Sequence, residues 1–155
     1  MKRILVLSDT HGRTEKACRV IEAIHPDAVI HLGDLVRDAN ELSYIYDEIP
    51  FYNVRGNNDF AMLDAEHVYE IFGFKFYCAH GHTISVTRGI ERAKEENCHA
   101  FLYGHTHKSE YSAEGDVIVM NPGSITRPRN DTFSFGVFEI ENDKLNGCIC
   151  PADGY

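Results

Sequence analysis

Short apolar runs separated by turn residues give the first third of the chain a regular rhythm of strands and helices. Apolar positions between residues 17 and 24 recur at helical spacing, which indicates a helix with one buried face, and Pro26 ends that segment. The pattern predicts strands over residues 2–8, 28–32 and 51–54, and helices over residues 13–24 and about 40–48. This order is a β-α-β-α-β opening.

The rest of the chain is richer in strands. Gly73 lies between two apolar runs, 68–72 and 75–79, that predict a hairpin, and a helix over 85–97 precedes a strand over 100–103. Further strands are predicted over residues 111–114, 117–121, 132–140 and 144–150. We expect these last strands to form a second sheet of largely antiparallel character. The fold class is therefore α/β, with two packed sheets flanked by helices.

Length and composition narrow the class of protein. The 155 residues are expected to form a single domain, 1–155, with enough chain to bury a sizeable core. A composition of 43% hydrophobic and 25% charged residues is ordinary for a globular protein and argues against disorder or membrane spanning. The net charge of −9 argues against extended nucleic-acid binding.

The amino terminus and the cysteines indicate a cytoplasmic protein. The first apolar run, Ile4 to Leu7, is too short for a secretory segment. The five cysteines are an odd number and widely scattered, which fits a reducing compartment. For Cys148 and Cys150 we expect a shared strand face rather than a metal or redox role.

Three polar residues come directly after predicted strands. Asp9, Asp34 and Asn57 follow the first, second and third strands in turn. In an open α/β sheet, ligands bind beyond the carboxyl ends of the strands. Three separate segments therefore deliver oxygen ligands to one edge, and Asp34 is assigned as a carboxylate that bridges two cations.

Taken singly, the same residues allow simpler interpretations. Asp9 could cap the helix that follows it, and Asn57-Asn58-Asp59 is ordinary turn sequence. His31 lies inside the second predicted strand, where a core or supporting histidine is more common than a metal ligand.

Two later segments strengthen the metal interpretation. Ala79-His80-Gly81-His82 and Gly104-His105-Thr106-His107 each place two histidines beside glycine at the end of a predicted strand. Abundant imidazole without thiolate favours Mn²⁺, Fe²⁺, Zn²⁺, Ni²⁺ or Co²⁺ over Mg²⁺ or Ca²⁺.

The ordered series DTH, GD, GNND, HGH and GHTH resembles the calcineurin-like metallophosphoesterases. The later segments Asn121-Pro122-Gly123-Ser124 and Arg127-Pro128-Arg129 resemble the small YfcE-like branch of prokaryotic phosphodiesterases. The match runs from Asp9 to about Arg129, which is nearly the whole chain.

The resemblance implies a four-layer αββα sandwich with a binuclear metal site. It assigns seven ligands to two divalent ions, for which Mn²⁺ is the expected metal and Fe²⁺, Ni²⁺, Co²⁺ or Zn²⁺ are alternatives. Asp34 is shared, and the two sets are Asp9, His11, Asp34 and His107, and Asp34, Asn57, His80 and His105. Two such ions can bind a bridging hydroxide that attacks phosphorus, so no serine or cysteine nucleophile is needed.

One position departs from the family pattern. Many relatives have a histidine after the ligand asparagine, paired with the next acid, whereas this chain has Asn58 before Asp59. An amide can donate a hydrogen bond to phosphate but cannot deliver a proton at neutral pH. We therefore assign catalytic roles to Asn58, Asp59 and His82, with His82 as an alternative proton donor.

Substrate contacts are assigned to Asn58 and to the segment that resembles the YfcE-like branch. Ser124 follows a Pro-Gly turn that can approach the metals closely, and Arg127 can contact phosphate.

The sequence thus predicts a binuclear-metal-dependent phosphoesterase, specifically a phosphodiesterase acting on a small or nucleotide-like phosphate ester. The alternative is a catalytically weak metal-binding scaffold for protein interaction with the same fold. We expect no membrane partner, and exposed edge strands make a homo-oligomer a further possibility.

Overall fold

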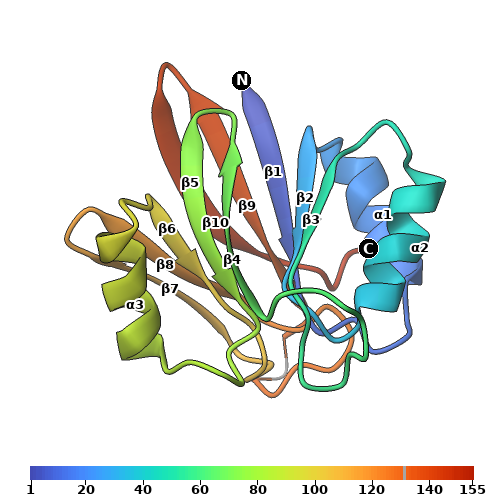
Figure 1. Ribbon diagram of the computed structural model, residues 1–155. Coiled ribbons are helices and arrows are strands. Elements are labelled where there is room, and N and C mark those ends of the chain that lie inside the picture. The colour runs from blue at the N-terminus through green and yellow to red at the C-terminus, as the bar shows by residue number, and fades with distance from the viewer. Residues whose placement is uncertain (131) are drawn as a thin grey trace.

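Two five-stranded sheets pack face to face in the computed structural model, which describes residues 1–130 and 132–155 (Figure 1). Helices α1 and α2 cover the outer face of one sheet, and α3 covers the outer face of the other. The predicted four-layer αββα sandwich of two mixed sheets is confirmed. The elements in order are β1 (Lys2–Leu7), α1 (Glu15–Ile24), β2 (Ala28–His31), α2 (Val36–Ile45), β3 (Phe51–Asn53), β4 (Glu66–Ile71), β5 (Phe74–Ala79), α3 (Val86–Glu95), β6 (Ala100–Leu102), β7 (Ser109–Glu114), β8 (Val117–Pro122), β9 (Ser134–Glu141) and β10 (Lys144–Pro151).

The sheet order corrects one expectation from the sequence. The last two strands do not join the second sheet, because β9 pairs with β1 and the first sheet runs β10-β9-β1-β2-β3. The second sheet runs β4-β5-β6-β8-β7, in which the two inner pairings are parallel and the two edge pairings are antiparallel. It is therefore mixed rather than largely antiparallel. Side-chain alternation marks a strand but carries no information on its partner.

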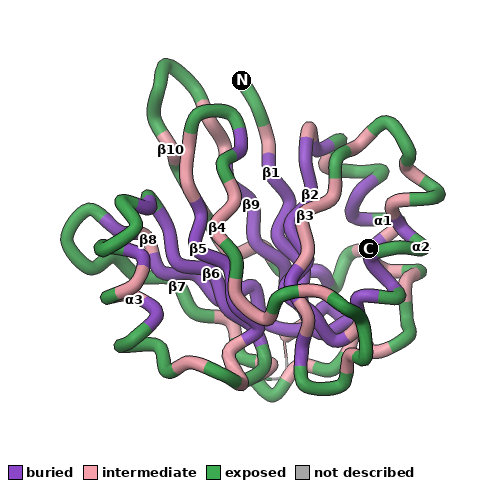
Figure 2. Tube along the Cα trace, viewed as in Figure 1, coloured by how far each residue is buried: buried purple, intermediate pink, exposed green. Residues whose placement is uncertain are grey.

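Three apolar clusters fill the three spaces between the four layers. In β1, Ile4 and Val6 point into the cluster between the sheets, whereas Leu5 and Leu7 point to the cluster beneath α1 and α2. Successive side chains of a strand face opposite sides, so this unbroken apolar run serves two interfaces at once. Figure 2 shows the result as buried segments running through the strands of both sheets. A third cluster lies between the second sheet and α3.

Helix α2 begins about four residues before the predicted start at residue 40, at Val36. The Val36 amide donates to Asp59 Oδ1 over 2.8 Å, so a side chain from a distant loop caps this helix. A local pattern cannot reveal such a cap. Among the described residues, no helix is long and apolar enough to cross a bilayer.

The carboxyl ends of β1, β2 and β3 and those of β5 and β6 lie at the same end of the molecule (Figure 1). Backbone hydrogen bonds join the loops that follow these strands: Asp9 N donates to Gly33 O over 3.0 Å, and Gly104 N donates to His80 O over 2.8 Å. The His105 amide donates to Asp9 Oδ2 over 3.1 Å and so links the loops of the two sheets. The chemistry-bearing loops therefore form one cluster.

Candidate metal centre

One group of possible ligands comes from the loop after β1 and the loop after β6. Asp9, His11 and His107 bring one ligand atom each within 4.8 Å of one another. His107 Nε2 lies 3.1 Å from Asp9 Oδ1 and 3.2 Å from His11 Nε2. A carboxylate and two imidazoles at this spacing can share one divalent ion.

A second group lies beside the first. His80 Nε2 is 3.5 Å from Asp34 Oδ2 and 3.1 Å from Asn57 Oδ1, and His105 Nδ1 is also 3.1 Å from Asn57 Oδ1. Asp9 Oδ1 borders this group as well, at 3.8 Å from His80 Nε2.

Asp34 stands between the two groups. Its Oδ2 atom, already close to His80, lies 4.0 Å from His11 Nε2. All seven residues that the sequence singled out therefore converge on one place, with Asp34 between the two groups.

The tautomers of two histidines test whether cations fit here. His80 Nδ1 lies 2.7 Å from Leu32 O, and His107 Nδ1 lies 2.7 Å from Arg127 O. A carbonyl oxygen only accepts, so each Nδ1 carries a proton, and in the neutral form of each ring the Nε2 lone pair faces the carboxylates. Asp9 Oδ1 is buried and has no hydrogen bond among the described residues. A divalent cation bound between these lone pairs and carboxylate oxygens would satisfy all of them.

The pKa values of the site residues agree with this interpretation. Burial alone would raise the pKa of Asp34, but His80 and the Asn58 amide outweigh it and hold that pKa at about 2. Burial would likewise raise the pKa of Asp9, yet the neighbouring imidazoles of His107, His11 and His80 keep it below its usual range. Burial alone would lower the pKa of His80, but the carboxylates of Asp34 and Asp9 outweigh it and raise that pKa above its usual value. The site thus favours positive charge, which two divalent ions would supply.

The backbone of the site is held in an uncommon conformation. Five of the seven candidate ligands have left-handed φ angles between 45° and 68°, and these are Asp9, His11, Asp34, His105 and His107. Non-glycine residues rarely adopt this region, and such strain collects where a fold holds functional side chains. The Ser124 hydroxyl donates to Asp9 O over 2.8 Å and Thr126 Oγ1 donates to the same atom over 3.1 Å, so the strained loop is tied down.

Two glycines allow the loops to pack this closely. A Cβ atom on Gly56 would lie 2.1 Å from Asp34 Oδ1, and one on Gly104 would lie 2.1 Å from Ser8 Oγ and 2.9 Å from Asp9 Oδ2. No larger residue fits at either position without moving a candidate ligand.

Asn58 and Asp59 both contact the Asp34 loop. Asn58 Nδ2 donates to Asp34 Oδ2 over 2.7 Å, and its amide donates to Asp34 Oδ1 over 3.0 Å. Asp59 accepts the amides of Asp34 (2.9 Å) and Gly56 (2.8 Å) on Oδ2, in addition to the Val36 amide on Oδ1. These bonds fix the orientation of Asp34.

The two substrate contacts expected beyond residue 120 occupy different surroundings. Ser124 is fully buried, and besides donating to Asp9 O its hydroxyl accepts the Arg127 amide over 2.8 Å. Its hydroxyl is thus engaged in holding the Asp9 loop, instead of facing a substrate. Arg127 is exposed, and its carbonyl fixes the His107 tautomer.

His82 lies close to the second group. Its ring centroid is 5.4 Å from that of His80 and 6.4 Å from that of His105. Burial, together with His80, lowers the pKa of His82. Its buried Nδ1 has no hydrogen-bond partner among the described residues.

A supporting network lies beneath the Asp9 loop, and of its members the sequence indicated only His31. His31, fully buried as expected for a core histidine, lies 3.1 Å from Thr10 Oγ1, which donates to Asp38 Oδ2 over 2.5 Å. Asp38 Oδ2 also accepts the Gly12 amide over 2.7 Å. Asp38 lies on the buried face of α2, where a carboxylate at one helical position gives no signal in a hydrophobic pattern.

Comparison with known proteins identifies the family. The family model described as the calcineurin-like phosphoesterase superfamily domain matches residues 1–143. A probable metallophosphoesterase of Mycoplasma pneumoniae is 31% identical over 137 residues, covering 84% of this chain and 83% of the relative. A phosphodiesterase of Methanocaldococcus jannaschii is 27% identical over 95% of this chain and 98% of its own.

A solved structure agrees. The crystal structure of a predicted phosphoesterase from Streptococcus pneumoniae superposes with a TM-score of 0.78 at 29% identity, covering 98% of this chain and 90% of that one. The chain therefore belongs to the calcineurin-like phosphoesterase superfamily.

Proposed function

We propose that this protein is a binuclear-metal-dependent phosphodiesterase that hydrolyses a small or nucleotide-like phosphate ester. One observation carries the proposal: the carboxylate oxygens of Asp9 and Asp34 lie opposite imidazole nitrogens at distances that a shared cation would bridge. A phosphodiesterase among the relatives supports the diester assignment. The five free cysteines are consistent with a cytoplasmic location.

Each candidate ligand has a role in this proposal. Asp9, His11 and His107 hold one ion, Asn57, His80 and His105 hold the other, and Asp34 is shared. Mn²⁺ is the expected metal because the set mixes imidazole with oxygen donors, and Fe²⁺, Ni²⁺, Co²⁺ and Zn²⁺ suit the same donors. When bound, two such ions activate water and stabilise the charge on the phosphoryl oxygens.

Protonation of the leaving oxygen affects which phosphate esters react fastest. The Asn58 carboxamide donates to Asp34 and has no proton to give at neutral pH. His82 is then the side chain that we assign to protonate a leaving oxygen, and because burial lowers its pKa, only a minor part of it carries that proton at neutral pH. We expect the rate to depend on leaving-group acidity, so that aryl phosphates and phosphodiesters react faster than alkyl monoesters.

Metal titration joined to a hydrolysis assay tests the function. Stepwise addition of Mn²⁺ to metal-free protein should raise the melting temperature and the rate of bis(p-nitrophenyl) phosphate hydrolysis together, with saturation near two ions per chain. A melting shift without turnover for any of a panel of diesters and monoesters would instead support the metal-binding scaffold.

A series of aryl methyl phosphodiesters tests the proton assignment. The rate should fall as the leaving-group pKa rises, and His82→Ala should steepen that fall. A flat dependence in the unmodified protein would contradict the role given to Asn58.

A further inference from the structure

A cavity of about 420 Å³ opens beside the candidate metal centre, between the start of α2 and the loop after β3. Its lining includes Val36, Arg37 and Asn40 from the helix, and Asn58 and Phe60 from the loop. This volume lies in the range of about 300–1,000 Å³ that small-molecule sites occupy.

A single side chain, that of Asn58, links the cavity to the candidate metal centre. Asn58 lines it and at the same time donates to Asp34 Oδ2, the oxygen that lies between the two ligand groups. A phosphate held at the metal centre would therefore carry one of its ester arms directly to this cavity.

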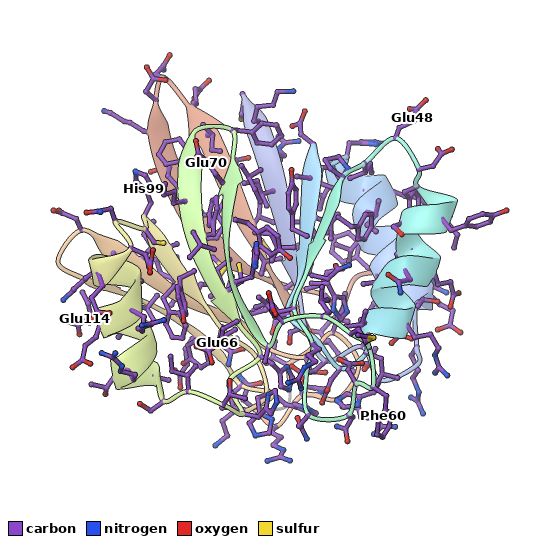
Figure 3. All side chains as sticks on the ribbon, in the orientation of Figure 1. Glu48, Phe60, Glu66, Glu70, His99 and Glu114 are labelled. Carbon is purple, nitrogen blue, oxygen red and sulfur yellow. The ribbon has the colours of Figure 1, made fainter. Side chains whose placement is uncertain are left out.

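Phe60 places an exposed aromatic ring at the edge of this cavity. Its side chain is fully exposed, and Figure 3 shows it at the end of the molecule where the site loops gather, below α2. Met62 in the same loop is equally exposed but does not line the cavity. An exposed phenyl ring at the edge of a cavity offers a face on which a planar group can stack.

Arg37 supplies the charge. Its Nη2 atom lies 3.3 Å from the place that a Cβ atom on Gly12 would take, next to the loop that carries His11. Among the described residues its carboxylate contact is Asp38 Oδ1, 3.9 Å from Nε, which is too long for a hydrogen bond. The guanidinium is thus available to a phosphate oxygen.

We infer that this cavity is the subsite for an aromatic, nucleobase-like arm of the phosphodiester. Phe60 stacks on the planar ring, Asn40 and Asn58 offer amide groups to its polar edge, and Arg37 binds the phosphate that joins the arm to the metal centre. The inference rests on the proposed function, because the phosphate must be anchored at the metals for the arm to reach the cavity.

Binding of two phosphate ligands to the Mn²⁺-loaded protein tests the subsite without turnover. Adenosine 5′-monophosphate and ribose 5-phosphate share the sugar phosphate and differ in the base, so calorimetry on both isolates the aromatic contribution. We expect the adenosine ligand to bind about tenfold more tightly, and Phe60→Ala to remove that advantage while leaving ribose 5-phosphate unchanged. Met62→Ala, the matched control, should change neither, and Arg37→Gln should weaken both alike.

Hydrolysis of bis(p-nitrophenyl) phosphate is measured on the same preparations, so that the two proposals fail separately. Turnover with equal affinity for the two ligands would overturn the subsite and leave the function standing. A base preference that Phe60→Ala abolishes, in a protein without turnover, would support the subsite and contradict the hydrolase. A preference that survives Phe60→Ala would also overturn the subsite.

Discussion

Replacing Asp59 by asparagine should destabilise the protein even when no metal or substrate is present. The Asp59 carboxylate accepts three backbone amides, from Gly56, Asp34 and Val36, over 2.8–2.9 Å. It thereby closes its own loop, fixes the candidate bridging residue and caps α2. In Asp59→Asn one oxygen remains as an acceptor and the other position becomes an NH₂ group, which faces an N–H donor.

The size of the effect follows from these three bonds. A hydrogen bond to a charged acceptor contributes about 2 kcal/mol, and a neutral one about 1 kcal/mol. The two bonds on Oδ2 keep an oxygen acceptor in the asparagine, and each becomes weaker by about 1 kcal/mol because the acceptor is no longer charged. The bond on Oδ1 is lost and its donor is left unpaired, which costs about 2 kcal/mol. The expected loss is about 4 kcal/mol in the free energy of unfolding, or a fall of roughly 10 °C in melting temperature for a chain of this size.

Urea denaturation of the metal-free protein is the assay. Asp64→Asn is the matched control, because the Asp64 side chain is 76% exposed, and its loss should cost less than about 0.5 kcal/mol. The urea midpoint and the rate of hydrolysis together distinguish a catalytic role of Asp59 from a positioning role. If Asp59→Asn unfolds at the same urea concentration as the parent protein while hydrolysis collapses, the positioning role is refuted and a direct catalytic role stands.

Three further outcomes are expected. Gly56→Ala should weaken Mn²⁺ binding by about tenfold or more in calorimetry, because the new methyl group would overlap Asp34 Oδ1, whereas Gly154→Ala, with open space around it, should bind as the parent does. Gly89→Ala should lower stability by about 1–3 kcal/mol in urea, because its Cβ would lie 2.1 Å from the Phe101 ring, while metal affinity stays unchanged. Removing Mn²⁺ with a chelator should lower the melting temperature yet leave the far-ultraviolet circular dichroism intact; a loss of secondary structure would contradict a prefolded site.

Much of the fold follows from the sequence because the apolar runs are long and regular. In β1 the four residues from Ile4 to Leu7 are all fully buried, and the spacing of Ala17, Val20 and Ile21 marks the buried face of α1. What the sequence could not supply was the pairing of β9 with β1 and the early start of α2. Both depend on contacts between distant segments, a ladder in one case and the Asp59 cap in the other.

The candidate ligands were predictable for a similar reason. Each is a metal-binding residue type at the end of a strand, and strand ends converge. The roles of the residues around them were less accessible. Ser124 and Asp38 carry polar groups that suit substrate or solvent equally well in the sequence, and their bonds to Asp9 O and Gly12 N appear only in three dimensions.

Hydrogen bonds within the protein hold the backbone of the site in place, and this has an energetic consequence. A left-handed backbone at a non-glycine residue costs about 1–3 kcal/mol, so the conformations of Asp9, Asp34 and His105 must be offset by the surrounding bonds. Three such bonds join protein groups alone: the Ser124 hydroxyl donates to Asp9 O, Asp34 N donates to the Asp59 carboxylate, and His105 N donates to the Asp9 carboxylate. We therefore expect metal binding to need little rearrangement of the cage, so that its free energy goes mainly into affinity. Supporting residues such as Asp59 should therefore affect metal affinity and stability together, whereas a ligand such as His107 should affect affinity more than stability.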